Sequence, residues 1–412
     1  MITRRAAARL FAGTTVTAVA SRIGAAHAED KVIKIGADLS LTGADAESAT
    51  RVKDGIILAI DAANKNKTVP GYTFELMTLD DGTATSGQYD PAQAATNARK
   101  MVSDQDVVAA IGPQMSGAGK AMAPILSQGD LATITPSSTN PDITSPKFAE
   151  QYRPAGKPIY FRTVTTDAFQ GPNMANYMAE ILKITSVYIL DDSGAYGVGL
   201  ADAYQAQIEK KGVKVLGRDR LDPKAADYSA ALTKIKALNP QAMYYGGVGQ
   251  AGIKLAKQAY DIIPDMIKAG GDGVVGASFL SGTGFPAAEG WYGTLASPHV
   301  TGDTKASDFV KEFTARFGVA PEDYSITAYD GTLVIIDAVK RVVASGKPVD
   351  RHLVRDAIQS GKVPTIQGIV SFDDNGDLAD RTVSVFQIKK DTNAKLDDVS
   401  AQYHYIAVAP QS

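Results

Sequence analysis

Hydroxyl groups and glycines gather in the segment IGPQMSGAGK, where a short apolar run gives way to a helical pattern. Ser116 stands at the predicted helix start, and Gly117 and Gly119 follow it. Free backbone N–H groups at a helix start, together with the helix dipole, favour a bound anion, and the Ser116 hydroxyl adds a donor. The same residues suit a simple helix cap, so the segment is either an anion site or a cap.

A second hydroxyl-rich segment, TITPSSTNP, contains the apolar strand end TIT and then a polar stretch. It places Ser137, Ser138, Thr139 and Asn140 around two prolines. One or two such residues satisfy a plain turn. The surplus therefore indicates either a polar loop with several capping residues or a shelf of hydrogen-bond donors that holds a ligand.

Two further candidates lie later in the chain. Asp272 stands among glycines in AGGDGVV, where its carboxylate can hold an ammonium group or bond its own backbone in a turn. Tyr196, in DDSGAYGVG, is either a ligand-facing aromatic residue or a core tyrosine. Each interpretation is open on the sequence pattern alone.

Common enzyme and metal motifs are missing from the sequence. In GPQMSGAGK, Ala121 occupies the place where a P-loop needs Ser or Thr to bind magnesium. FDDNGDLAD resembles a calcium loop in composition but lacks its spacing and closing Glu. The chain has four histidines and no cysteine, and no nucleophile–base motif occurs. We therefore expect a binding protein that is not an enzyme and needs no cofactor.

The candidate segments follow predicted β-strands. In each half of the chain, β-branched or apolar runs such as KVIKIGADLS and TSVYILDD alternate with stretches of helical periodicity. This order predicts an α/β fold with two successive modules, each a doubly wound parallel sheet covered by helices. Ligands of open α/β sheets bind outside the carboxyl ends of the strands, which is where the candidate segments lie.

Composition and the N-terminal segment indicate an exported soluble protein. The 412 residues are 44% hydrophobic and 21% charged, and the net charge of -3 gives no reason to expect a nucleic-acid partner. Residues 1–28 combine a basic start, a weakly apolar stretch and an Ala26-His27-Ala28 cleavage pattern, which predicts a cleaved export signal of the Sec or twin-arginine type. No later run is long enough to span a bilayer. We expect a periplasmic protein.

These segments together resemble the periplasmic substrate-binding proteins of ABC importers, in the branched-chain amino acid (Leu/Ile/Val-binding) family. The likeness rests on an ordered set that spans nearly the whole mature chain: IKIGADLSLTG, DDGTATSGQYDPAQAATNARKMV, IGPQMSGAGKAMAPI, TITPSSTNP, FRTVTTDAFQGPNMANYM, DDSGAYGVGLADAY, YYGG, AGGDG and GIVSFDDNGDL. The resemblance implies a type I periplasmic-binding fold with two lobes joined by three crossovers. It assigns residues 31–162 plus 298–367 to lobe 1 and residues 163–297 plus 368–412 to lobe 2.

The resemblance also implies roles for single residues. It assigns Ser116, Ser137 and Thr139 to the carboxylate and ammonium of an amino acid, Asp272 to the ammonium, and Tyr196 to closure over the ligand. Where some relatives have pocket aromatics, this chain has Ser48 and Val248. The segment 145–158 is longer than in typical relatives.

The expected function is therefore to bind a small amino acid, branched-chain or neutral aliphatic first, between two lobes. The protein would act as a monomer and deliver the ligand to an ABC permease and ATPase complex. An aromatic acid, another small carboxylate or an amide is the alternative ligand, and a sensory ligand-binding role is the alternative function, because one fold can serve both.

Overall fold

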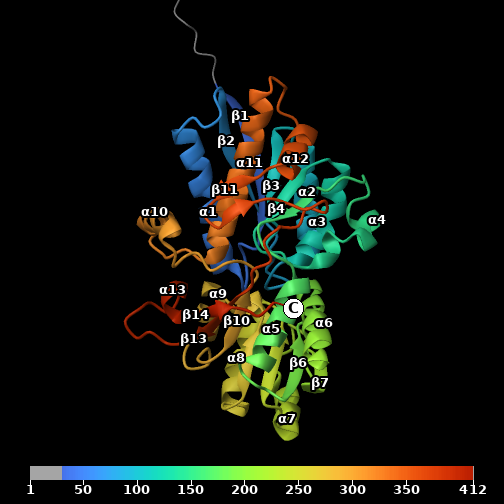
Figure 1. The fold of residues 1–412 in the computed structure, drawn as a ribbon, viewed down its shortest axis with the longest axis vertical. Helices are drawn as coiled ribbons and strands as arrows, with labels where there is room; N and C mark the ends of the chain where they lie inside the picture. Colours follow the sequence, from blue (N-terminus) through green and yellow to red (C-terminus); the bar gives the residue numbers. More distant parts are fainter. Residues whose placement is uncertain (1–29, 412) are drawn as a thin grey trace, which may run out of the picture.

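The computed structural model describes residues 30–411, which fold into two lobes that lie one above the other in Figure 1. The predicted export signal, residues 1–28, lies outside the described residues. Lobe 1 is built on a five-stranded parallel sheet in the order β2-β1-β3-β4-β5. Its strands are β1 (Lys31–Leu39), β2 (Tyr72–Asp80), β3 (Val107–Ile111), β4 (Ala132–Thr135) and β5 (Tyr160–Arg162).

Helices cover both faces of the lobe 1 sheet. They are α1 (Ala46–Lys65), α2 (Pro91–Ser103), α3 (Ser116–Gln128), α4 (Ala149–Tyr152), α10 (Ser307–Phe317), α11 (Asp323–Ala344) and α12 (Arg351–Gln359). Strand β3 is buried at every position, which is the pattern of a strand covered on both faces. The helix α11 comes late in the sequence but packs against α1.

Lobe 2 contains a seven-stranded sheet in the order β14-β13-β10-β9-β8-β6-β7. Its strands are β6 (Ser186–Asp191), β7 (Lys214–Arg220), β8 (Ala242–Gly246), β9 (Ile267–Gly270), β10 (Tyr292–Leu295), β13 (Ser384–Ile388) and β14 (Tyr403–Val408). Five of these strands run parallel, β13 pairs antiparallel with β10, and β14 pairs antiparallel with β13. The α/β prediction is confirmed, and the two antiparallel pairings at one edge are an addition to it.

The helices of lobe 2 pack around this sheet. They are α5 (Asp167–Glu180), α6 (Ala195–Lys210), α7 (Ser229–Leu238), α8 (Gly249–Ile262), α9 (Ala277–Thr283) and α13 (Val399–Gln402). The loops that follow β6, β8 and β9 lead into α6, α8 and a short 3₁₀ turn, Asp272–Val274. These loops therefore gather at the carboxyl edge of the sheet, as the binding rule for open sheets requires.

The third connection between the sheets differs from the expected boundary at residue 367. Strand β12 (Gly368–Val370) pairs with β11 (Val363–Thr365) in an antiparallel hairpin, so a boundary after residue 367 would divide that hairpin. Asp330 of α11 accepts hydrogen bonds from the backbone N–H groups of Ile366 and Gln367, which fixes the hairpin to lobe 1.

The segment after the hairpin also lies against lobe 1. Asp377 forms an ion pair with Arg162 of β5, with 2.8 Å between the carboxylate oxygen and Nε. The ring of Phe372 packs against that of Phe161. The chain therefore passes to lobe 2 between Leu378 and Ser384, because local pairing and this buried ion pair hold it on lobe 1 until then.

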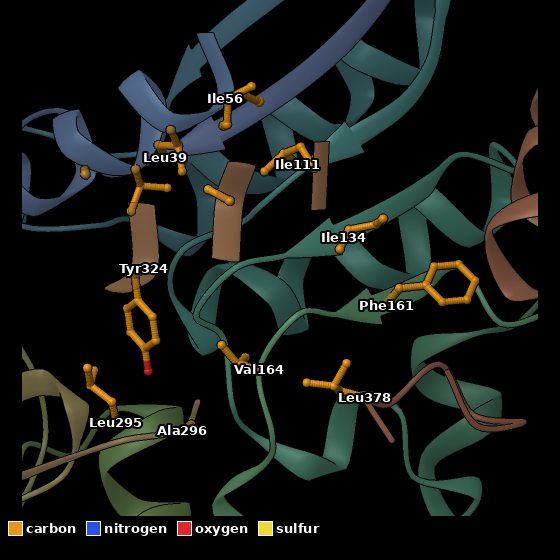
Figure 2. Close-up of a cluster of buried hydrophobic side chains, with 14 of the residues drawn as sticks. Leu39, Ile56, Ile111, Ile134, Phe161, Val164, Leu295, Ala296, Tyr324 and Leu378 are labelled. Atoms are coloured by element: carbon orange, nitrogen blue, oxygen red, sulfur yellow. The ribbon is translucent and has the colours of Figure 1, made fainter. Parts of the chain in front are cut away.

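A continuous apolar core reaches from lobe 1 to the connections between the lobes. Figure 2 shows Ile111 of the first sheet near Ile56 of α1, Ile134 farther along that sheet, Val164 on a connecting segment and Leu295 at the end of β10. Tyr324 extends from the start of α11 toward lobe 2. Among the residues that the structure describes, no helix has the length and apolar character of a membrane span.

Candidate functional site

A cavity lies between the two lobes and contains about 760 Å³ of empty space, part of it open to solvent. Lobe 1 contributes Asp45, Ser48, Val52, Tyr89, Gln114, Met115, Ser116, Ser137, Glu322 and Tyr324. Lobe 2 contributes Asp192, Gly194, Tyr196, Val248, Gly249, Asp272, Gly273, Val275, Ser278 and Phe279.

The structure brings most of the sequence-predicted residues to this cavity. Ser116, Ser137, Tyr196, Asp272, Ser48 and Val248 line its wall. Thr139 does not: it is fully buried, and its carbonyl accepts a hydrogen bond from the backbone N–H of Asp167. The chain turns inward after Ser138, so the TITPSSTNP segment presents one hydroxyl residue to the cavity where two were expected.

Ser116 and Ser137 form a polar shelf on lobe 1. Ser116 is the first residue of α3, and no side chain caps that helix start. Its hydroxyl accepts a hydrogen bond from the Asn140 N–H at 3.2 Å, while the Ser137 hydroxyl donates to the carbonyl of Gln114 at 3.0 Å. The shelf thus has an uncapped helix terminus, which attracts an anion such as a carboxylate.

Arg162 holds the loop that carries this shelf. Its guanidinium is fully buried and donates to the carbonyl oxygens of Ser138 and Asn140, the second at 2.7 Å. The same side chain pairs with Asp377. Arg162 therefore holds the loop in place through hydrogen bonds to its backbone, and it does not line the cavity. Sequence reasoning missed this residue because its partners are distant in the chain.

Asp272 is held by three side chains at the lobe 2 wall. Its Oδ1 accepts hydrogen bonds from the Tyr196 hydroxyl at 2.5 Å and from Gln170 Nε2 at 2.9 Å. Its Oδ2 accepts from the Tyr324 hydroxyl at 3.0 Å. Burial raises the pKa of Asp272, while these donors act in the opposite direction. Each carboxylate oxygen has further lone pairs, so the group can still accept from an ammonium.

The electrostatic character of the cavity is acidic. Asp45, Asp192, Asp272 and Glu322 line it, and none of the described lining residues is Lys, Arg or His. Burial, and then the nearby charge of Asp192, raise the pKa of Asp45 to about 7. Burial raises the pKa of Asp192 to about 6. A ligand that carries positive charge is favoured here over a bare anion.

The two lobes touch each other around the cavity. The Ser48 N–H donates to the Ser278 hydroxyl at 2.9 Å, and the Ser48 hydroxyl contacts Glu322 at 3.1 Å. Asn140 of lobe 1 donates to the carbonyl of Ala195 at the start of α6, at 2.8 Å. The Ser48–Ser278 and Asn140–Ala195 bonds cross from one lobe to the other, so the structure represents a closed arrangement.

Several lining residues escaped the sequence analysis. Asp45 and Asp192 lie in loops that follow strands, and this position could have marked them as cavity-lining residues. An acidic residue in a loop is most often a turn residue, however, so the position alone did not select them. Glu322 and Tyr324 stand at the start of α11, a helix that follows the helix α10 instead of a strand. No strand-end rule selects them, because their position depends on how the lobes pack.

A family model described as periplasmic binding protein matches residues 32–393. The chain belongs to the periplasmic binding protein family. It is 30% identical over 377 residues to a Leu/Ile/Val-binding protein of Rhizobium johnstonii, across 90% of this chain and 96% of the relative. It is 29% identical to a leucine-, isoleucine-, valine-, threonine- and alanine-binding protein of Pseudomonas aeruginosa, across 93% and 96%.

A solved structure agrees with this assignment. A leucine-binding protein of Thermotoga maritima superposes with a TM-score of 0.77 at 26% identity, and the match covers 92% of this chain and 98% of that one. Periplasmic binding proteins bind substrates and are not enzymes, and the family places this chain in the periplasm. The fold and the substrate-binding class are those that the sequence resemblance implies.

Proposed function

We propose that this periplasmic binding protein binds an α-amino acid between its lobes and delivers it to an ABC permease and ATPase complex. The observation that carries the proposal is the pairing of an uncapped helix start at Ser116 with an acidic group at Asp272 across one cavity. The first suits a carboxylate and the second an ammonium, which is the charge pattern of an amino acid.

The printed names of the relatives favour branched-chain or other neutral aliphatic amino acids, so these are the first ligands to test. In this proposal Ser116 and Ser137 bind the carboxylate, Asp272 binds the ammonium, and Tyr196 closes over the ligand from lobe 2. Ser48 and Val248 border the side chain. The protein acts as a monomer and is exported by a Sec or twin-arginine signal.

An aromatic acid without an ammonium fits less well, because no basic side chain among the described lining residues would balance its charge. A sensory partner in place of the importer would use the same closed state. Closure by hinge motion lets the partner distinguish loaded from empty protein.

The experiment is a thermal-shift and calorimetric screen of the purified exported protein. Leucine, isoleucine, valine and alanine are compared with benzoate at equal concentration. We expect at least one amino acid to raise the melting temperature and benzoate to leave it unchanged. A melting temperature that rises with benzoate and with no amino acid contradicts the proposal. Transport of the bound ligand in cells with and without the permease distinguishes the importer role from sensing.

A further inference from the structure

The cavity holds more acidic groups than one ligand ammonium requires. Three of them already have protein partners. Asp272 accepts three hydrogen bonds from side chains, and Glu322 accepts from Ser48 and from the Ala277 N–H, with Arg51 at 3.7 Å. The other pair is Asp192, which accepts from the backbone N–H groups of Gly194 and Val248, and Asp45, whose side chain has no hydrogen-bond partner among the described residues. Nothing in the binding of an amino acid's carboxylate and ammonium uses this pair.

Asp45 and Asp192 flank the same turn from opposite lobes. Asp192 Oδ2 accepts a hydrogen bond from the Val248 N–H at 3.0 Å. The next residue, Gly249, lies so close to Asp45 that a Cβ added there would be 2.5 Å from its Oδ2. A side chain at Gly249 would therefore collide with the carboxylate. The two acids thus close around one end of the cavity when the lobes meet.

Asp45 has no partner among the described residues. Its side chain does not cap α1, its Oδ2 is buried, and the residue is 7% exposed. A second lining residue, Gln114, is 8% exposed and has a buried Oε1 without a partner. Buried acceptors are normally satisfied, so these two cavity-lining oxygens lack donors that a ligand can supply.

We infer that the site binds amino acids whose side chain ends in a positively charged nitrogen, with Asp45 and Asp192 as its acceptors. The inference rests on the proposed function, because the carboxylate and ammonium are held as proposed above. It extends the ligand range beyond hydrocarbon side chains. A cationic nitrogen between the two carboxylates balances their repulsion and supplies N–H donors to Asp45.

The test uses matched pairs of ligands that differ only in the terminal nitrogen. Calorimetry on the purified full protein compares lysine with norleucine and ornithine with norvaline. We expect the cationic member of at least one pair to bind about ten-fold tighter or better, in keeping with a charge-assisted hydrogen bond at a buried carboxylate. Equal or tighter binding of norleucine and norvaline overturns the inference and leaves the proposed function intact.

Variants separate a specific role from a general charge effect. Asp45→Asn and Asp192→Asn should each reduce the ratio of lysine affinity to norleucine affinity about five-fold or more. Glu75→Gln removes an exposed negative charge on β2 and should change neither affinity. An unchanged preference in both cavity variants overturns the assignment. If no amino acid binds the unmodified protein, leucine included, the proposed function fails and the inference fails with it.

Discussion

The hydroxyl of Tyr324, at the start of α11 in lobe 1, donates a hydrogen bond of 3.0 Å to Oδ2 of Asp272 in lobe 2. Tyr324 extends between the lobes, as Figure 2 shows. The bond therefore joins the proposed ammonium site to the closed arrangement of the lobes. In the proposed function, ligand binding and closure are coupled through one carboxylate, because both would use Asp272.

Replacing Tyr324 with Phe should weaken ligand binding, because it removes a donor to a buried carboxylate that exists only when the lobes are closed. Hydrogen bonds to charged groups contribute about 1.5–3 kcal/mol, which corresponds to a loss of affinity of roughly ten- to a hundred-fold. Calorimetry with the best amino acid measures the change. Tyr329→Phe, on the same helix but outside the cavity, is the matched control and should bind normally.

Asp272→Asn should reduce amino-acid affinity more strongly. The change removes the proposed charge partner of the ligand ammonium but retains most of the hydrogen-bonding capacity that Tyr196 and Gln170 need. Loss of one partner of a buried charge pair costs about 2–5 kcal/mol. Asp261→Asn on the exposed end of α8 is the control. Unchanged affinity in Asp272→Asn would remove the role assigned to this residue.

Stability of the empty protein should fall as pH rises from about 4 to 8. Burial, and then the charge of Asp272, raise the pKa of Asp167 to about 8, and the pKa of Asp45 is raised to about 7. A carboxyl group whose folded pKa exceeds its unfolded value stabilises the fold while protonated. That contribution is lost as pH rises through the folded pKa.

Melting temperatures at pH 5 and pH 8 measure this dependence. We expect the value at pH 8 to be lower by about 4 °C or more, since each pKa unit corresponds to about 1.4 kcal/mol. Asp167→Asn should flatten the profile because it removes the group with the larger shift. A melting temperature that rises steadily from pH 5 to pH 8 contradicts the prediction.

Arg51→Met should destabilise the closed arrangement. The Arg51 side chain on α1 is almost fully buried, donates to the backbone carbonyl of Asp397 at 2.8 Å, and pairs with its carboxylate at 2.7 Å. Asp397 lies between β13 and β14 of lobe 2, so the pair joins the lobes. We expect a loss of about 2–4 kcal/mol in unfolding free energy, together with weaker ligand binding.

Chemical denaturation followed by circular dichroism measures the stability of Arg51→Met. Arg99→Met, on the exposed face of α2, is a matched control that should stay within about 0.5 kcal/mol of the unmodified protein. A variant that retains both stability and affinity would show that the Arg51–Asp397 pair does not hold the lobes together.

The alternation of strands and helices predicted the α/β architecture because each element has a local periodicity that burial imposes. The same rule placed Ser116, Ser137, Tyr196 and Asp272 at strand ends, and the structure brings them to one cavity. The position of Thr139 was not predictable in this way. Adjacent hydroxyl residues in a loop differ in direction, and the backbone turn that sets the direction depends on contacts with Asp167 and Arg162.

The sequence by itself determined the class of fold and the family, and it marked Ser116 as a helix start, because these depend on local patterns and their order along the chain. Only the tertiary structure decided that Tyr324 meets Asp272, that Asp45 faces Asp192, and that the third connection begins after Leu378. Each of these relationships joins segments far apart in sequence. Such contacts depend on how the two lobes pack against each other, and the local periodicity of the sequence does not predict this packing.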